Sequence, residues 1–137
     1  DNLDNFVITA QAGALLFKEG RLLLVKSHGK PYFITPGGKY EEGESAEDCL
    51  KRELMEELQV EVASVKHYKE YQLKAANSDS PLEIGLYLVE IKGEPNISRK
   101  IEIMKWLRKE EIQNKKVNVA PSFETFLPDF INDGLMQ

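Results

Sequence analysis

The chain of 137 residues has only one cysteine, Cys49, and no long apolar run. One thiol excludes an intrachain disulfide framework and a cysteine-based zinc site, because both need several cysteines. Apolar stretches such as Leu22–Val25 are far too short to cross a bilayer. We therefore expect no contact with a membrane. A lone thiol fits a reducing compartment, and we predict a cytoplasmic protein.

The sequence also lacks internal repeats, low-complexity tracts and any stretch typical of a linker. Its length suits one domain, and a chain of this size buries enough surface to fold without covalent staples. We predict a single domain over residues 1–137. Whether that domain acts as a monomer or a homodimer stays open.

Positive charge is in slight deficit, with 18 Lys and Arg against 23 Asp and Glu and a net charge of −5. Residues 41–57 account for the deficit, because they hold eight acids and only two bases. A concentrated acidic segment disfavours binding to a nucleic-acid polymer, which needs cations against its phosphates. The same segment suits a site that collects divalent cations.

Apolar periodicity predicts strands mixed with helices, which is typical of an α/β or α+β layered fold. The strongest helix runs from Ser45 to Leu58, because leucines recur there every four residues. A loop rich in glycine and proline is expected over residues 27–40 and a polar turn over 75–81. The expected strands cover residues 6–17, 21–26, 60–73, 82–91 and 101–107, of which the first two are candidates for a hairpin. A short helix is expected over 109–114, and a last helix over 122–132 that Pro128 should kink or interrupt.

Three carboxylates share one side of the strongest helix. At about 100° per residue, Glu53, Glu56 and Glu57 fall within about 100° of one another and border the stripe of leucines. Carboxylates crowded at a buried edge raise one another's pKa, a cost that a bound cation removes. Oxygen ligands with no His or Cys beside them favour Mg²⁺ or Mn²⁺. The alternative is a solvated acidic face, which is the more common role of three glutamates on a helix.

Residues 38–60 read GKYEEGESAEDCLKRELMEELQV and closely resemble the Nudix box. The box is written G-x5-E-x7-R-E-U-x-E-E-x-G-U, where U is apolar, and eight of its nine specified positions match. Phe33–Gly38 is similar to the aromatic-x-x-Pro-Gly-Gly segment that precedes the box in the family. The departure is Gln59, where the box has glycine; this capping position carries no side-chain chemistry, and glutamine there costs roughly 1 kcal/mol or alters the turn. The matching residues are Gly38, Glu44, Arg52, Glu53, Leu54, Glu56, Glu57 and Val60.

The resemblance implies an α/β/α sandwich with a mixed sheet between helices. It also implies metal ligation by the carboxylates of Glu53, Glu56 and Glu57, joined by the carbonyl of Gly37. Glu53 is the leading candidate for the base that activates water. Arg52 would orient that carboxylate, and Glu44 would hold the junction between loop and helix. For Arg52 a plain surface ion pair is the alternative, and for Glu44 a simple interaction with the helix dipole.

The family often supplies a further acidic ligand from outside the box. Glu102 is the first choice here and Glu94 the second, although an exposed glutamate is the more common reading of each. Candidate substrate contacts are Phe33, which could stack on a base, Lys39, which could neutralise phosphates, and Asn118. Further loop candidates are Lys26, His28, Lys30 and Tyr32.

The leading hypothesis is a hydrolase dependent on Mg²⁺ or Mn²⁺ that cleaves a nucleoside diphosphate linked to another moiety X. The alternative is a non-catalytic Nudix-like module that binds or senses a nucleotide, and the intact glutamates argue against it. An acidic-helix interaction protein is disfavoured by the Pro-Gly-Gly loop. Marks of ADP-ribose and dinucleoside-polyphosphate hydrolases are absent, since Ala76, Asn77 and Ser78 occupy their places. By elimination, a MutT-like activity on nucleoside triphosphates is weakly favoured.

Overall fold

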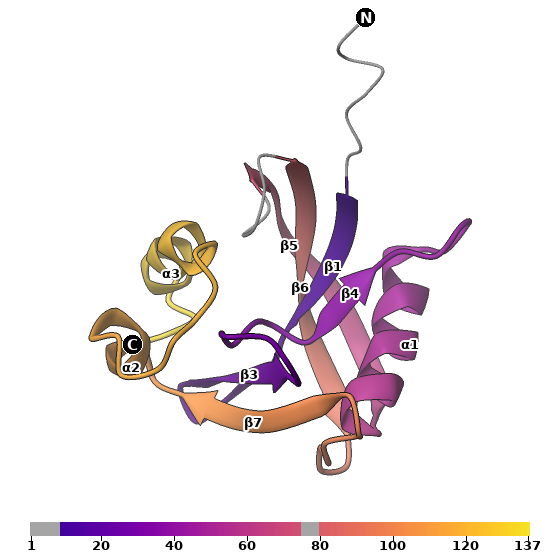
Figure 1. The fold of residues 1–137 in the computed structure, drawn as a ribbon, viewed down its shortest axis with the longest axis horizontal. Coiled ribbons are helices and arrows are strands. Elements are labelled where there is room, and N and C mark those ends of the chain that lie inside the picture. Colours follow the sequence, from indigo (N-terminus) through magenta and orange to yellow (C-terminus); the bar gives the residue numbers. More distant parts are fainter. Residues whose placement is uncertain (1–8, 75–79) are drawn as a thin grey trace, which may run out of the picture.

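A computed structural model of the chain describes residues 9–74 and 80–137 (Figure 1). Two sheets are present in these ranges, one with strand order β4-β1-β6-β5 and one with order β2-β3-β7. The pairing of β1 with β6 is parallel and the other pairings are antiparallel, so the predicted mixed sheet is confirmed. Helix α1 covers one side of the larger sheet, and α2 and α3 lie on the other side (Figure 1). The strands are β1 (Thr9–Leu15), β2 (Phe17–Lys18), β3 (Arg21–Ser27), β4 (Gly37–Lys39), β5 (Glu61–Lys74), β6 (Pro81–Lys92) and β7 (Ile101–Leu107), and the helices are α1 (Ala46–Leu58), α2 (Lys109–Gln113) and α3 (Phe123–Asn132).

The strand predicted over residues 6–17 is divided between the two sheets. β1 ends at Leu15 and β2 begins at Phe17, so the predicted hairpin is reduced to the short pairing of β2 with β3. Leu15 and Leu16 are both buried, but they belong to the cores on opposite sides of the larger sheet. The hairpin is therefore confirmed only at its turn end, because a continuous apolar run does not reveal where the chain changes sheets. Residues 6–8 of that prediction, and residues 75–79 of the predicted polar turn, lie outside the described ranges.

The loop predicted over residues 27–40 contains strand β4, which pairs with β1. Gly37 has a φ of +135°, and a Cβ at this position would lie 2.1 Å from the carbonyl oxygen of Ala12. Only glycine permits this close approach of the two backbones. The sequence did not predict β4, because Gly37–Lys39 forms a strand through its pairing with β1 and not through strand propensity.

Helix α1 confirms the predicted helix at residues 45–58. Its N-cap is Ser45, whose Oγ accepts a hydrogen bond from the backbone N–H of Asp48 at 3.1 Å. The predicted leucine stripe is fully buried against the larger sheet, and each such leucine contributes roughly 1.5–3 kcal/mol. The buried residues on this side of the sheet are Ala12, Ala14, Leu16, Leu23, Val25, Cys49, Leu50, Leu54, Leu58, Val60, Val89 and Ile101.

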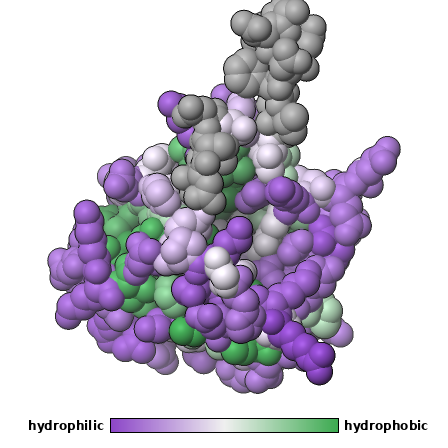
Figure 2. All heavy atoms as spheres, in the orientation of Figure 1, coloured by the Kyte–Doolittle hydropathy of each residue, from purple (hydrophilic) through white to green (hydrophobic). Residues whose placement is uncertain are grey.

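Helix α3 packs on the opposite side and runs through Pro128 without ending. The predicted interruption was wrong, because Phe126 and Phe130 are buried on either side of the proline and hold both turns against the core. None of the helices in the described part of the chain has the length and apolar character that a membrane crossing requires. In Figure 2, hydrophilic residues cover the side of α1, and apolar residues show around α2 and α3.

Candidate active site

The carboxylate of Glu57 is the most buried of the three on α1. The residue is only 6% exposed, and its Oε2 accepts a hydrogen bond from the backbone N–H of Gly37 at 3.2 Å. Glu53 and Glu56 are more open, with side chains 15% and 37% exposed. Exposure to solvent therefore increases from Glu57 through Glu53 to Glu56.

Burial, together with a hydrogen bond with the Glu53 side chain, raises the pKa of Glu57 to about 9. The N–H of Gly37 acts in the opposite direction, because it stabilises the ionised form. Glu57 thus keeps its proton at neutral pH in the metal-free protein. The crowding expected from the helical spacing is present in the structure.

Two glycines bring the backbone of β4 against these carboxylates. A Cβ on Gly38 would lie 2.7–2.9 Å from the carboxylate atoms of Glu53, which is closer than real contacts allow. Gly37 is the donor to Glu57. A side chain at either position would displace the strand from the helix, so the Gly-Gly step is a requirement of this geometry.

Arg52 links the loop, the start of α1 and the Glu53 carboxylate. Its Nε and Nη2 each donate to Glu44 at 2.8 Å, and its Nη1 donates to Glu53 Oε1 at 2.7 Å. A further bond from Nη2 reaches the carbonyl oxygen of Lys39 at 3.1 Å. The guanidinium lowers the pKa of Glu44 to about 2, and the N–H of Glu41 adds to this effect. Because the guanidinium donates to Glu44 through two nitrogens, Arg52 is held in one orientation.

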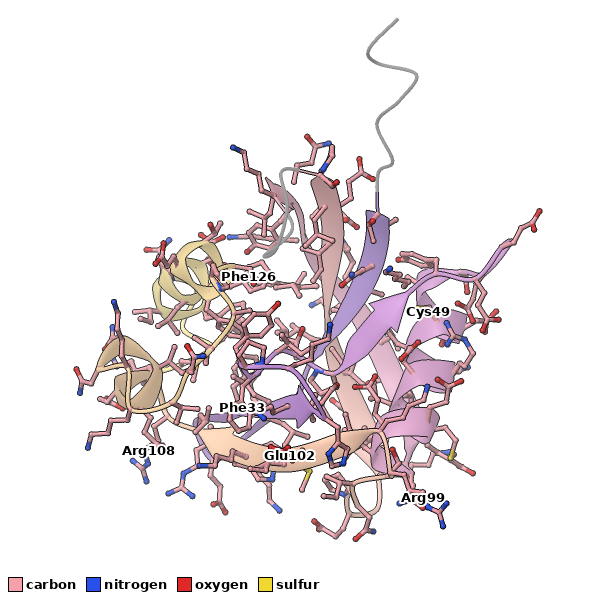
Figure 3. All side chains as sticks on the ribbon, in the orientation of Figure 1. Phe33, Cys49, Arg99, Glu102, Arg108 and Phe126 are labelled. Carbon is pink, nitrogen blue, oxygen red and sulfur yellow. The ribbon has the colours of Figure 1, made fainter. Side chains whose placement is uncertain are left out.

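The predicted acids outside the box lie apart from this cluster. Glu102 is on β7 (Figure 3), where its carboxylate accepts from Lys26 Nζ at 2.7 Å and lies 3.7 Å from His28 Nδ1. Glu94 is exposed and lies 4.0 Å from Lys18. Neither has a contact with the three carboxylates of α1 among the described residues.

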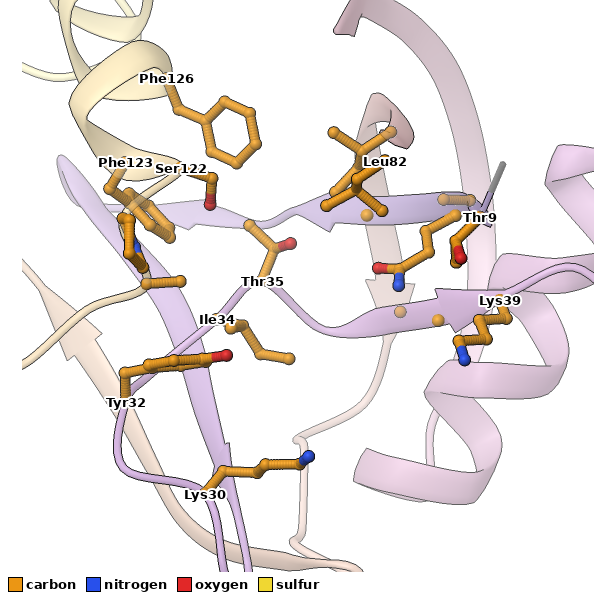
Figure 4. Close-up of a pocket in the computed structure, with 18 of the residues that line it drawn as sticks. Thr9, Lys30, Tyr32, Ile34, Thr35, Lys39, Leu82, Ser122, Phe123 and Phe126 are labelled. Carbon is orange, nitrogen blue, oxygen red and sulfur yellow. The ribbon is translucent and has the colours of Figure 1, made fainter. Parts of the chain in front are cut away.

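A pocket of about 410 Å³ adjoins the Gly37–Gly38 backbone (Figure 4). Its walls come from β1, β6, the loop before β4 and the beginning of α3. Lys30 and Lys39 project toward the same space from the loop and from β4. Other residues that line the pocket include Gln11, Gly13, Tyr32, Thr35, Ile84, Ser122, Phe123 and Phe126.

Of the three residues predicted to contact substrate, only Lys39 lines this pocket. Phe33 is 6% exposed and packs in the core below Lys105, whose Nζ lies 5.8 Å from the ring centroid. Asn118 donates from Nδ2 to the carbonyl oxygen of Pro31 at 2.6 Å and so fastens the loop. Tyr32, the neighbour of Phe33, does line the pocket.

Sequence reasoning missed Thr35, which is the other buried polar or charged residue besides Glu57 in the described ranges. It is 6% exposed and projects into the pocket (Figure 4), above Gly13, where a Cβ would lie 2.7 Å from its Oγ1. The described residues provide no hydrogen-bond partner for this hydroxyl. A single threonine in a loop gave no signal, and Phe123 and Phe126 were not singled out within the predicted helix.

The NUDIX domain family model matches residues 8–130, which is most of the chain. The chain belongs to the Nudix family. It is therefore a Nudix hydrolase, a pyrophosphohydrolase of a family that acts on nucleotide derivatives and generally uses divalent metal ions. A search of curated proteins gave no match.

Solved structures share the Nudix fold over nearly the whole chain. The MutT protein of Methanosarcina mazei Go1 is similar with a TM-score of 0.80 and 17% identity, covering 94% of this chain and 96% of that one. The E. coli ORF135 protein has a TM-score of 0.76 and 23% identity, with 94% and 92% covered. The MutT Nudix hydrolase of Burkholderia pseudomallei has a TM-score of 0.68 and 24% identity, with 76% and 85% covered. At these identities the likeness concerns the fold alone.

The Nudix box departs from its pattern at Gln59, yet the turn is the left-handed one that glycine favours. Gln59 has φ 56° and ψ 40°, and its N–H donates to the carbonyl oxygen of Met55 at 3.1 Å. Its side-chain Nε2 donates to the carbonyl oxygens of Asn96 and Ile97, each at 3.2 Å. These bonds compensate for the strain of a non-glycine residue and anchor the segment before β7.

The donors of the Nudix helix fit a hard divalent cation. Within the described ranges no three His, Cys, Asp or Glu side chains are arranged as a ready metal site. Glu53 is bonded to Arg52, and Glu56 lies 3.1 Å from Lys100 Nζ. The carboxylate oxygens nevertheless suit Mg²⁺ or Mn²⁺, and a cation would stabilise the ionised form of Glu57, which burial and the nearby Glu53 disfavour.

Proposed function

We propose that this Nudix hydrolase uses Mg²⁺ or Mn²⁺ to cleave a nucleoside diphosphate linked to another moiety X, with nucleoside triphosphates as the favoured substrates. The observation that carries the proposal is the pocket of about 410 Å³ beside the glycines that contact Glu53 and Glu57. This volume lies within the range of small-molecule sites. The cytoplasm, where nucleotides are abundant and Cys49 stays reduced, is the proposed location.

The lining of the pocket suits a nucleoside with phosphates at its mouth. Phe123, Phe126 and Ile84 offer apolar surface for a base, and the Thr35 hydroxyl offers a hydrogen bond to its edge. Lys30 and Lys39 have no ion-pair partner among the described residues, so their charges are available to phosphates. The phosphates would thus extend from the pocket toward the carboxylates of α1.

Glu53, Glu56, Glu57 and the Gly37 carbonyl would hold the metal, joined by any acid that lies close enough when substrate is present. When bound, the ion supplies neutralisation of phosphate charge and a lower pKa for water. Glu53 accepts the proton of the water whose oxygen attacks phosphorus, while the bond from phosphorus to the leaving oxygen breaks. Arg52 fixes the orientation of Glu53, and the two bonds from Glu44 fix Arg52. The two lysines balance charge on the phosphates.

Product release from a panel of nucleotides tests the proposal, measured as phosphate or pyrophosphate from nucleoside triphosphates and as nucleoside monophosphate from nucleoside diphosphate sugars. The panel contains the common ribo- and deoxyribonucleoside triphosphates and nucleoside diphosphate sugars, each with Mg²⁺, Mn²⁺ or excess EDTA. We expect turnover that needs the metal and rises above neutral pH, as carboxylates ionise. Full turnover in EDTA contradicts the metal assignment, and binding without turnover supports a nucleotide-sensing module instead.

A further inference from the structure

Helix α3 forms one wall of the pocket, through Ser122, Phe123 and Phe126 (Figure 4). A helix satisfies its own backbone groups, so side chains and the preceding segment decide where this wall lies. The preceding segment is fixed by backbone bonds, since the N–H of Phe33 donates to the Asn118 carbonyl at 2.8 Å and the N–H of Ala120 to the Phe33 carbonyl at 3.0 Å. The rest of the helix is held by side-chain contacts with the core, among them those of two tyrosines of β5.

Tyr71 of β5 contacts the pocket wall twice. Its hydroxyl donates to Asp129 Oδ2 at 2.7 Å, and its ring meets Phe126 edge-on with the centroids 4.9 Å apart. Tyr71 also pairs in the sheet with Ile84, which lines the pocket. Tyr71 therefore links α3 to the strand pair that carries Ile84, through its side chain on one side and its backbone pairing on the other.

Tyr68 makes a parallel contact farther along the same helix. Its hydroxyl donates to Asp133 Oδ2 at 2.5 Å, and its ring lies 5.8 Å from Phe130. Asp133 is the C-cap of α3, and Phe130 does not line the pocket. Lys69 lies between the two acids, 3.7 Å from Asp129 Oδ2 and 3.0 Å from Asp133 Oδ2. The two tyrosines thus tie the same strand to the same helix, but only Tyr71 touches a residue of the wall.

We propose that Tyr71 is a positioning residue for substrate, whose hydrogen bond to Asp129 holds Phe126 at the spacing that the bound base requires. The inference rests on the proposed function, because it takes the pocket as the nucleoside site. The bond lies outside the carboxylate cluster of α1. Its loss therefore weakens substrate binding and leaves the chemical step unchanged. Burial and the neighbouring Asp129 raise the pKa of Tyr71, so the hydroxyl remains a donor across the working pH range.

The test compares Tyr71→Phe with Tyr68→Phe, which removes an equivalent hydroxyl bond at the far end of α3. For Tyr71→Phe we expect KM to rise by roughly three- to tenfold, because only part of the energy of the hydrogen bond to the Asp129 carboxylate acts on substrate binding, with kcat within about twofold of wild type. Tyr68→Phe should lower the melting temperature about as much as Tyr71→Phe does, but it should leave KM unchanged. Asp129→Asn retains an oxygen that can accept from Tyr71, so its KM should rise less than that of Tyr71→Phe.

Affinity for a non-hydrolysable triphosphate analogue, measured by calorimetry, should fall most in Tyr71→Phe, less in Asp129→Asn and not at all in Tyr68→Phe. An unchanged KM and an unchanged affinity in Tyr71→Phe, with wild type active, overturn the positioning role and leave the proposed function intact. Equal rises in Tyr71→Phe and Tyr68→Phe also overturn it, because they indicate general loosening of α3. A wild type that neither binds nor cleaves any nucleotide refutes the proposed function, and the positioning role with it.

Discussion

Among single residues, Glu53 is the one on which the interactions of the site converge. It accepts from Arg52 at 2.7 Å, bonds to Glu57 and lies against Gly38. Arg52 is itself fixed by two bonds to Glu44, so the Glu53 carboxylate has little rotational freedom. A base that removes a proton from water needs this kind of fixed orientation.

Replacing Glu53 by glutamine should therefore lower kcat by on the order of 10² or more, since the amide cannot accept the proton and is a poorer metal ligand. The matched control is Glu47→Gln on the same helix. Glu47 is exposed and forms an ion pair with Lys51 at 3.5 Å, so the loss of its charge should be nearly neutral. Steady-state kinetics and thermal melts of both variants check this. Equal losses of kcat at the two positions would show that the catalytic face of α1 is misassigned.

Thr35 allows a second prediction at this scale. Its hydroxyl opens onto the pocket and has no hydrogen-bond partner within the described residues, so a bound substrate can supply one. Thr35→Val should therefore raise KM by roughly three- to tenfold, while the melting temperature of the free protein stays the same or rises. Thr125→Val, on the exposed side of α3, should change neither quantity. A marked fall in the melting temperature of Thr35→Val would mean that the hydroxyl is bonded within the protein.

At the scale of elements, helix α1 was predictable because capping, leucine spacing and acid spacing agree along one continuous segment. Strand β4 was not predictable, because Gly37–Lys39 has no strand propensity and becomes a strand only through its pairing with β1. The change of sheet at Leu16 was equally hidden, since both sheets bury apolar residues there. Local signals therefore identified the elements, and contacts distant in sequence decided how they were joined.

The end of α1 at Gln59 carries a prediction that separates backbone strain from side-chain bonding. Gln59→Ala keeps the left-handed backbone but loses both bonds to the segment before β7, so the free energy of unfolding should fall by about 1 kcal/mol. Gln59→Gly loses the same bonds but relieves roughly 1 kcal/mol of strain, so it should be nearly neutral. Chemical denaturation of the two variants measures the difference. If glycine were clearly less stable than alanine, the strain assigned to Gln59 would be wrong.

At the scale of the whole molecule, the pocket joins residues that no local pattern connects. Gln11, Thr35, Ile84 and Ser122 are widely spaced in sequence and meet only because β1 pairs with β6 and α3 packs against that sheet. The carboxylates of α1, by contrast, share one helix and could be found by their spacing alone. This is why the acidic cluster was predicted from the sequence and most of the pocket lining was not.

The stability of the whole molecule should depend on pH through Glu57. The unfolded chain releases this proton near pH 4.5, whereas the folded protein retains it up to about pH 9. Between these values the folded state binds more protons, so the free energy of unfolding falls as pH rises. Glu44 acts in another window, because its pKa of about 2 affects stability only below about pH 4.5. A scan from pH 5 to pH 9 therefore isolates Glu57 from Glu44.

Glu57→Gln should remove this loss of stability and raise the melting temperature of the metal-free protein. The amide oxygen can accept from the Gly37 N–H and the amide NH₂ can donate to Glu53, so both contacts survive without the buried charge. The gain should grow toward pH 9 and amount to a few degrees, since about 1 kcal/mol corresponds to about 4 °C at this size. Mg²⁺ should stabilise wild type more than the variant, because the cation binds the ionised carboxylate and links that energy to the native state. Melts of both proteins across the pH range, with and without Mg²⁺, measure each effect. Identical melting temperatures of the two proteins in all conditions would mean that the Glu57 charge neither destabilises the fold nor binds the metal.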